Sequence, residues 1–338
     1  MITRLRWGIL STAGINVALV PAIRNSQRSE LIAIASRSKD KAEAYARENR
    51  IPHVYGSYDS LISDPEIDVV YIPLPNTMHC EWTVHAAQSG KHVLCEKPIV
   101  TTLAEMEKIE KAARENDVVV FEAFMSLHAP QNIRVKKMIE AGKLGELQFI
   151  DSWFTYFLPP EDKHNIRLNP TLGGGALWDV GVYPISLAIA TAGVGPPREV
   201  WATQVTGETG VDIMFAGQMV FSNGMVAHIS CGLRAPFAYG ARFVGTHGIV
   251  RIADPVIPGM KNRVESGPDS RIEFSRKDGT DETIVIPSAN PWSAEVEAME
   301  ACVLDGAEPI VPLNLSKQFV VSGVALSESA RTGQVVRL

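Results

Sequence analysis

The first third of the chain alternates short β-branched runs with amphipathic helical patterns, and this alternation restricts the fold more than any other feature. Strands are predicted at residues 5–10, 31–36, 69–72, 92–95 and 118–121, with a weaker one near Val54. Helices are predicted between them, at 17–23, 41–48, 80–88 and 103–114. Because helices in this order connect parallel neighbouring strands, the pattern predicts a doubly wound α/β sheet of the dinucleotide-binding type.

From about residue 125 the pattern changes to long alternating strands joined by tight turns. The clearest strands are 147–157 and 200–205, and Asn223-Gly224 and Asp278-Gly279 mark two hairpins. Further helices are predicted near 131–141, 177–190, 294–304 and 316–329. The expected fold class is α/β, with an N-terminal doubly wound parallel sheet over 1–124. A C-terminal α+β domain with a large, mostly antiparallel sheet is expected over 125–338.

Composition narrows the possible partners. At 338 residues the chain exceeds the usual size of one hydrophobic core, which agrees with two domains. The net charge of −6 forms no basic stripe, so no nucleic-acid partner is expected. No signal peptide and no run of about 20 apolar residues is evident, so we expect a cytoplasmic protein without a membrane partner. No metal site is expected, because the cysteines do not have metal-ligand spacing; they are Cys80, Cys95, Cys231 and Cys302.

The first predicted strand leads into the place where a dinucleotide fold has its glycine-rich turn. A G-x-G-x-x-G frame that begins at Ser11 has Ser11, Ala13 and Asn16 at its small positions, and none of them is glycine. Backbone N–H groups at the helix start can still bind a pyrophosphate, although an ordinary turn is the alternative. The cofactor-binding residues expected here are Ser11, Thr12, Ala13, Gly14 and Ile15.

The end of the second strand indicates which dinucleotide is bound. A fold that prefers NAD usually has an acidic residue here, whereas this chain has Ser36 and Arg37. A hydroxyl and a guanidinium can bind a ribose 2′-phosphate, so NADP is the expected cofactor. The alternative is that Arg37 is only a solvated loop charge. We also expect Lys41 and Tyr58 to bind the cofactor.

Two further loops follow strand ends at the edge where such sheets bind ligands. The first, residues 73–76, contains two prolines that make a stiff wall, and Asn76 and His79 can offer hydrogen bonds to a ribose. The second is Glu96-Lys97-Pro98, for which a surface turn is the alternative. The cofactor-binding residues expected in these loops are Pro73, Leu74, Asn76, His79, Glu96 and Lys97.

A third group of residues lies between Gly173 and Tyr183. Three consecutive glycines enter a helix and allow another surface to approach the backbone closely. Asp179 and Tyr183 are four residues apart and share one helix face, and Gly181 leaves a gap where a flat ring can pack. The alternative is a core tyrosine beside a helix-capping aspartate.

These residues suit the oxidation of an alcohol by hydride transfer, which requires a general base for the hydroxyl proton. A free tyrosine has a pKa of about 10, so a tyrosine base needs a nearby ammonium to stabilise its phenolate. We therefore predict Tyr183 as the base and Lys97 as the ammonium. Asp179, the third predicted catalytic residue, orients a substrate hydroxyl.

With these motifs the whole chain resembles the glucose-fructose oxidoreductase, inositol dehydrogenase and MocA (Gfo/Idh/MocA) family. The resemblance is carried by four segments: residues 35–37, 71–76, 90–98 and 174–183. Tyrosine rather than histidine at position 183 is similar to the branch of D-xylose dehydrogenases, dimeric dihydrodiol dehydrogenases and glucose-fructose oxidoreductase.

The resemblance implies a Rossmann domain that clamps the cofactor and Lys97 and Tyr183 as the catalytic pair. It also implies a cis peptide before Pro98 and an open C-terminal sheet that forms a homodimer or a dimer of dimers. A pyranose or related polyol is the implied carbohydrate substrate. Asn165 and Arg167 resemble a substrate-side segment of this branch, so the predicted substrate-binding residues are Asn165, Arg167, Asp179 and Tyr183.

Three functions agree with the sequence. The first is an NADP-dependent aldose or pyranoside dehydrogenase that oxidises a ring hydroxyl. The second is an NADPH-dependent reductase of keto-sugars, anhydro-sugars or diol-type substrates, because both directions use the same residues. The third is a non-catalytic NADP-binding sensor, which the presence of both Lys97 and Tyr183 argues against.

Overall fold

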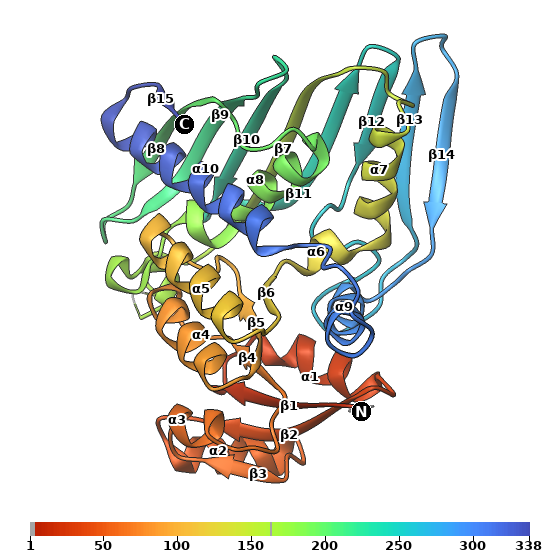
Figure 1. Cartoon of the computed structure of the whole chain (residues 1–338). Helices are drawn as coiled ribbons and strands as arrows, with labels where there is room; N and C mark the ends of the chain where they lie inside the picture. The colour runs from red at the N-terminus through yellow and green to blue at the C-terminus, as the bar shows by residue number, and fades with distance from the viewer. Residues whose placement is uncertain (1–3, 163) are drawn as a thin grey trace. The chain divides into compact units, whose positions relative to one another are not determined.

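The computed structural model describes residues 4–162 and 164–338, and the chain divides into two compact units (Figure 1). The first unit runs from the start of the described chain to Val100 and includes Ala104–Phe124 and Trp292–Leu313. The second unit includes Thr101–Leu103, Met125–Pro291 and Asn314–Leu338. The division into domains at residue 124 remains a prediction, and the late segment that groups with the first unit was not anticipated.

The first unit contains a six-stranded sheet of order β3-β2-β1-β4-β5-β6 in which every pair is parallel. Its strands are β1 (Leu5–Leu10), β2 (Ser29–Ala35), β3 (His53–Tyr55), β4 (Val69–Ile72), β5 (His92–Glu96) and β6 (Val120–Ala123). The central strands are almost wholly buried, as short apolar runs in a parallel sheet require. The predicted doubly wound sheet is confirmed.

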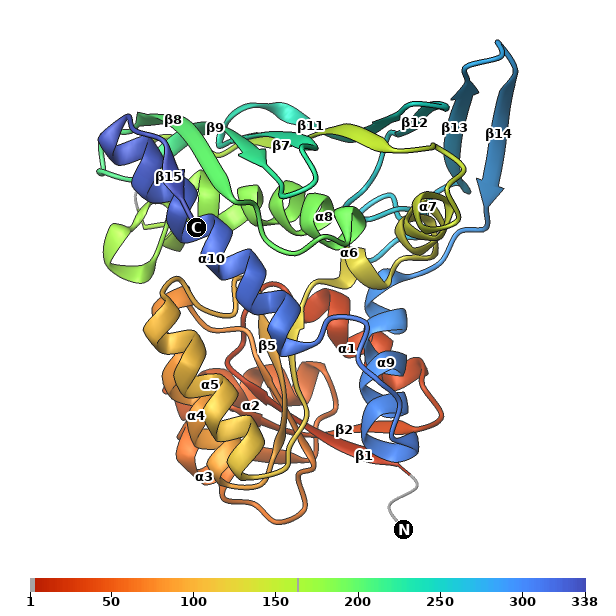
Figure 2. The ribbon, with the colours of Figure 1, turned by 45° about the horizontal axis from the view of Figure 1, so that its top comes forward.

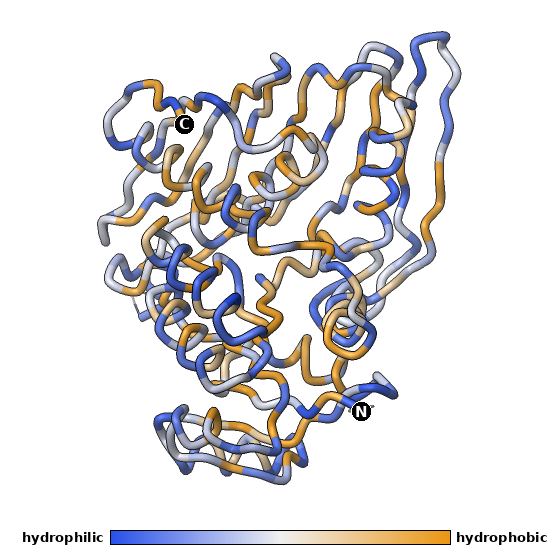
Figure 3. The backbone as a smooth tube through the Cα atoms, viewed as in Figure 1, coloured by the Kyte–Doolittle hydropathy of each residue, from blue (hydrophilic) through white to orange (hydrophobic). Residues whose placement is uncertain are grey.

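The helices of the first unit are α1 (Asn16–Asn25), α2 (Lys39–Glu48), α3 (Tyr58–Ile62), α4 (His79–Gln88), α5 (Leu103–Glu115) and α9 (Pro291–Asp305). Figure 3 shows hydrophilic and hydrophobic turns alternating along α4 and α5, as expected for helices that cover a sheet. The short α3 was not predicted. The Ser57 hydroxyl caps it by accepting a hydrogen bond from the Ser60 N–H.

Helix α9 is tied to the first unit by a buried carboxylate. Glu300, only 3% exposed, accepts hydrogen bonds of 2.5 Å from the hydroxyls of Ser26 and Ser29. The indole N–H of Trp7 donates to the Ser29 hydroxyl at 2.9 Å. The two hydrogen bonds to Glu300 join residues about 270 positions apart and explain why the segment groups with the first sheet.

The second unit contains a nine-stranded sheet of order β14-β13-β12-β11-β7-β10-β9-β8-β15. Its strands are β7 (Leu147–Phe157), β8 (Glu199–Thr206), β9 (Asp212–Val220), β10 (Val226–Gly232), β11 (Arg234–Gly245), β12 (Gly248–Ile252), β13 (Ser270–Arg276), β14 (Asp281–Ile286) and β15 (Val336–Arg337). β7 and β10 are parallel, and the other pairs are antiparallel. The predicted mostly antiparallel sheet is confirmed, as are the hairpins at Gly224 and Gly279, both with φ of 86°.

The helices of the second unit cover one face of this sheet and leave the other face bare (Figure 2). They are α6 (Met125–His128), α7 (Pro130–Glu140), α8 (Val182–Ala192) and α10 (Leu313–Thr332). One stretch, Pro170–Ala192, has the length and composition of a membrane-spanning helix, and 67% of its most apolar window is buried inside the structure. Core helices of soluble proteins have the same properties.

Candidate active site

The turn after β1 has an open geometry that suits a pyrophosphate. Ser11 has a left-handed φ of 92°, and the side-chain amide of the fully buried Asn16 donates to the Ser11 carbonyl at 2.9 Å. Helix α1 begins without a side-chain cap, and a Cβ added to Gly14 would meet nothing within 4 Å. Uncapped N–H groups beside open space are what an anion at a helix start needs. The anchoring role of Asn16 was not predicted.

At the end of β2, Arg37 is held by an aromatic group. Its guanidinium hydrogen-bonds the hydroxyl of Tyr58, whose ring packs edge-on against Trp82 with ring centroids 5.0 Å apart. Burial raises the pKa of Tyr58, so its hydroxyl stays protonated. Ser36 is 8% exposed, and its hydroxyl accepts from the Ser38 N–H. Arg37 is therefore an exposed cation with one defined partner, which favours an anion-binding role over an unrestrained loop charge.

The two loops after β4 and β5 are joined by His79. This residue is fully buried, and its ring nitrogens lie 2.7 Å from the Pro98 carbonyl and 2.8 Å from the Leu74 carbonyl. Burial lowers the pKa of its imidazole. With both nitrogens facing backbone carbonyls and no exposed surface, the ring cannot hydrogen-bond a ribose, contrary to the expectation from the sequence. A neutral imidazole has one N–H, so His79 donates a hydrogen bond to one of these carbonyls and packs against the other, and its ring lies between the two loops.

The loop after β5 has the expected cis peptide between Lys97 and Pro98. Next to it, the Glu96 carboxylate accepts a hydrogen bond of 2.6 Å from the hydroxyl of Tyr71, a fully buried β4 residue. The Ile99 N–H donates to the buried Glu122 carboxylate at 2.9 Å. Carboxylates on both sides therefore hold the segment that carries Lys97 in one conformation.

In the second unit, Asp179 is the centre of a hydrogen-bonded group. Its Oδ2 accepts from the Tyr156 hydroxyl at 2.7 Å and from the Arg167 Nε at 2.9 Å. Burial and the charge of Asp179 raise the pKa of Tyr156 far above its usual value, so this phenol acts as a donor. The carboxylate in turn raises the pKa of Arg167. Tyr156 was not predicted; the sequence placed it in the strand predicted at 147–157 but gave no sign that its hydroxyl meets Asp179.

The remaining predicted substrate-side residues have identified contacts. Asn165 caps a short turn, η2 (Ile166–Leu168), by accepting from the Arg167 N–H at 3.1 Å, and it donates to Asp162 at 3.0 Å. Tyr183 packs against Phe154 with ring centroids 5.6 Å apart, and its hydroxyl lies 3.8 Å from the Met125 sulfur. The structure thus brings Arg167 to Asp179, while a direct substrate contact by Asn165 and the pairing of Tyr183 with Lys97 remain predictions.

The glycines before Asp179 accommodate parts of this chain. A Cβ at Gly174 would lie 2.5 Å from the Arg167 carbonyl, and one at Gly175 would lie 2.1 Å from Asp212 Oδ1. A Cβ at Gly181 would lie 2.8 Å from the sulfur of Cys231 on β10. The expected gap for a flat ring at Gly181 is therefore absent in the described structure, because the sheet fills it.

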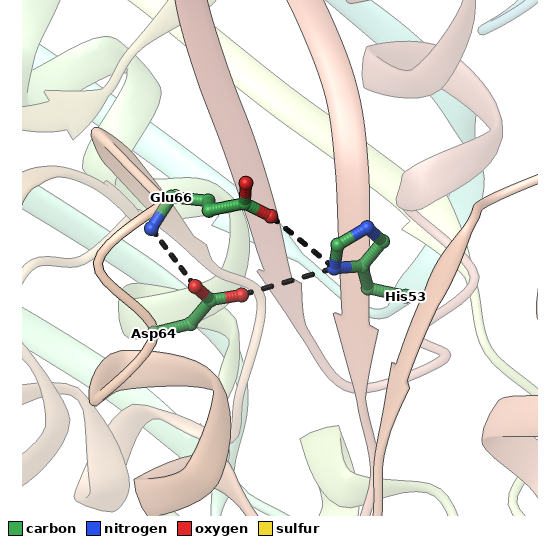
Figure 4. Close-up of side chains that lie close together, drawn as sticks. All are labelled: His53, Asp64 and Glu66. Atoms are coloured by element: carbon green, nitrogen blue, oxygen red, sulfur yellow. Dashed lines mark hydrogen bonds and ion pairs between the residues drawn. The ribbon is translucent and has the colours of Figure 1, made fainter.

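A separate cluster in the first unit contains His53, Asp64 and Glu66 (Figure 4). The His53 Nδ1 lies 3.9 Å from an oxygen of each carboxylate. Asp64 also accepts hydrogen bonds from the Tyr55 hydroxyl at 2.5 Å and the Glu66 N–H at 2.8 Å. Burial opposes the ionisation of Asp64, but the hydrogen bonds from Tyr55 and Glu66 lower its pKa, so this carboxylate is stabilised by groups of the protein itself.

Asp212 generates a prediction about stability. Burial raises the pKa of its carboxyl to about 6, well above the usual range of an aspartate. The folded state therefore binds the Asp212 proton more tightly than the unfolded state does. This binding stabilises the fold fully at low pH, and the stabilisation is lost as the pH rises through about 6. Compared with Asp212→Asn, the wild type should lose about 2–3 kcal/mol of unfolding free energy between pH 4 and 7. Urea titrations across this range measure the difference, and a constant difference would contradict the assignment.

Comparisons with known proteins identify the family of this chain. The family "Oxidoreductase family, NAD-binding Rossmann fold" matches residues 5–124, and "GFO/IDH/MocA C-terminal domain" matches residues 133–251. A D-xylose 1-dehydrogenase (NADP(+)) from Haloferax volcanii is 35% identical over 99% of this chain and 100% of its own length.

Solved structures show the same similarity. A 3-ketoreductase from Actinomadura kijaniata, in complex with NADP and TDP-benzene, has a TM-score of 0.86 at 28% identity and covers 96% of this chain and 98% of its own. An aldose-aldose oxidoreductase from Caulobacter crescentus, complexed with glycerol, has a TM-score of 0.88 at 27% identity over 99% of this chain and 100% of its own. Both family domains and a full-length relative match, so the chain belongs to the Gfo/Idh/MocA family of oxidoreductases.

Proposed function

We propose that this oxidoreductase is an NADP-dependent dehydrogenase that oxidises a ring hydroxyl of a pyranose or related polyol in the cytoplasm. The observation that carries the proposal is the Asp179 carboxylate, held by Tyr156 and Arg167 one helical turn before Tyr183. An ionised carboxylate is a strong acceptor for a sugar hydroxyl. The full-length similarity to a D-xylose 1-dehydrogenase (NADP(+)) supports the same substrate class and cofactor.

In the proposed reaction, Asp179 accepts a hydrogen bond from a neighbouring substrate hydroxyl and so orients the sugar. Tyr183, as phenolate, takes the proton of the reacting hydroxyl, and the electron pair of that O–H bond forms the new C=O bond. The bound nicotinamide supplies the acceptor for the hydride. The ammonium of Lys97 stabilises both the phenolate and the developing alkoxide, which a nearby positive charge does most effectively where water is excluded.

The reverse reaction, the reduction of a keto-sugar with NADPH, is a second candidate. It is favoured by the similarity to a 3-ketoreductase that was solved with NADP and TDP-benzene. The same residues serve both directions, with Tyr183 then donating the proton. A non-catalytic sensor has no need of a proton-transfer pair, so it is the least supported alternative.

The predicted role of Lys97 can be tested by substitution. Lys97→Met and Tyr183→Phe should each lower kcat/KM about 10²- to 10⁴-fold, because each removes part of the proton-transfer pair. The assay follows absorbance of the reduced cofactor with NADP and a panel of aldoses, and with NADPH and keto-sugars. Lys108→Met, at an exposed lysine of α5, is the control. Full activity of Lys97→Met on the best substrate would contradict the mechanism.

Arg37 should determine the cofactor preference. Arg37→Asp should weaken NADP binding by about 1.5–3 kcal/mol, roughly 10- to 100-fold, because it removes a charge-assisted hydrogen bond to the 2′-phosphate. NAD binding should change little. Arg47→Asp, at an exposed arginine of α2, makes the same charge change outside the proposed site. Titration with NADP and NAD measures the preference, and unchanged NADP affinity would contradict the role of Arg37.

The bare face of the nine-stranded sheet supports a homodimer. Directly paired residues form one row across it and therefore point to the same side; they are Trp201, Gln218, His228, Asp151, Arg242, Arg251 and Glu273. Trp201 is 45% exposed, and Arg242 pairs with Asp151 at 3.1 Å. Opposite charges and an exposed aromatic in one row suit a self-complementary two-fold contact.

If this face forms the dimer, Trp201→Glu should shift the protein to the monomer by placing an unpaired charge in the contact. Light scattering at micromolar concentration measures the mass. The control is Val194→Glu, which changes an exposed apolar residue in the loop after α8. A Trp201→Glu protein with the wild-type mass would contradict this contact.

A further inference from the structure

The turn that carries the proposed catalytic residues is anchored by a carboxylate on another strand. Asp212 is the first residue of β9, and its Oδ2 accepts a hydrogen bond from the Leu177 N–H at 2.7 Å. The Ala176 N–H is a second backbone donor to the same carboxyl. Leu177 begins a π-helical turn, η4 (Leu177–Gly181), that contains Asp179 and continues directly into α8 and Tyr183.

The glycine-rich turn is shaped around this carboxylate. Gly175 has a φ of 121°, which L side chains rarely adopt, and a Cβ there would lie 2.1 Å from Asp212 Oδ1. The Gly175 carbonyl accepts the Asp179 N–H at 3.0 Å. A chain of contacts therefore runs from Asp212 through Gly175 and Leu177 to the backbone of Asp179. Gly175 therefore leaves room for a carboxylate of this chain, which the N–H groups of Leu177 and Ala176 bind.

The ionised form of Asp212 is costly where it lies. Burial is the main cause of its raised pKa, and the backbone donors only partly offset it. Asp212 acts on the Cys231 thiol of the adjoining β10, whose pKa is raised by burial and by the charges of Asp212 and Asp179. Among the described residues no cation contributes to its pKa. An uncharged residue would be less costly at neutral pH, so the carboxylate is better explained by geometry than by stability.

We propose that Asp212 is a positioning residue: by holding the N–H groups at the start of η4, it sets the placement of Asp179 and Tyr183. This inference rests on the proposed function, because it assigns Asp212 to the same reaction. Asp212 touches neither substrate nor cofactor in this proposal. Its loss should therefore lower kcat about 10- to 100-fold and leave the KM for NADP unchanged.

The test compares Asp212→Asn with Asp278→Asn. The amide retains the size of the carboxyl but presents an NH₂ group where the carboxylate offers only acceptors. Asp278 is the matched control, because it also accepts a backbone N–H, that of Thr280 at 2.9 Å, beside a glycine with positive φ in the β13–β14 hairpin. Asp278→Asn should retain the wild-type kcat.

Hydrogen exchange provides a readout that needs no substrate. In the wild type, the amides of residues 176–181 should be protected from exchange. In Asp212→Asn these amides should exchange at least 10-fold faster, while the exchange rates of other peptides stay unchanged. Asp278→Asn should leave these amides as protected as in the wild type. Unchanged protection in Asp212→Asn overturns the proposal, as does lost protection with an unchanged kcat.

A double-mutant cycle measures the coupling between Gly175 and Asp212, and so separates a local effect on the turn from a general loss of folding. Gly175→Ala strains the backbone in any background, because Gly175 has a φ of 121°, but only in the presence of Asp212 does its Cβ also displace the carboxylate. Gly175→Ala should therefore lower kcat more in the wild type than in an Asp212→Ala background. Equal effects in both backgrounds overturn the coupling. If the wild type turns over no sugar, the proposed function fails, and the exchange experiment still decides whether Asp212 anchors the turn.

Discussion

The hydrogen bonds that converge on Asp179 Oδ2 are the constraint on which the candidate site depends. Tyr156 comes from β7, Arg167 from η2, and Asp179 from η4, so one oxygen fixes three segments that are separate in the sequence. A carboxylate oxygen that accepts two such hydrogen bonds is held in one orientation. The backbone of the same turn is held by Asp212, which accepts a hydrogen bond from the Leu177 N–H. Side chains and backbone are thus constrained independently, which is how a site obtains a defined geometry.

In the first unit, too, buried side chains hold the loops of the candidate site through hydrogen bonds to the backbone. The His79 ring lies between backbone carbonyls of the two loops after β4 and β5, and Asn16 holds the turn after β1. Both side chains are fully buried, so they act within the protein. The exposed groups of this unit, such as Gly14 and Arg37, are the ones left for a ligand. Buried polar residues shape the loops, and exposed ones are available for contacts.

Periodicity predicted the elements well because each one has a local cause. The strands at 5–10, 69–72 and 147–157 have the predicted bounds, since β-branched and aromatic runs end at turn residues. Helix α3 was missed because five residues are too few for a periodic pattern. The segment 292–313 groups with the first unit through Glu300, and no local pattern indicates which sheet a late helix will join.

The sequence by itself determined the fold class, the family and the positions of the motifs, because these depend on local patterns of apolar, glycine and charged residues. Only the tertiary structure decided what the glycines and His79 contact. A glycine in the sequence shows that a close approach is possible, but not whether a ligand or another strand makes it. At Gly175 and Gly181 the approaching groups are Asp212 and Cys231, which lie more than 30 residues away and meet these glycines only when the sheet forms.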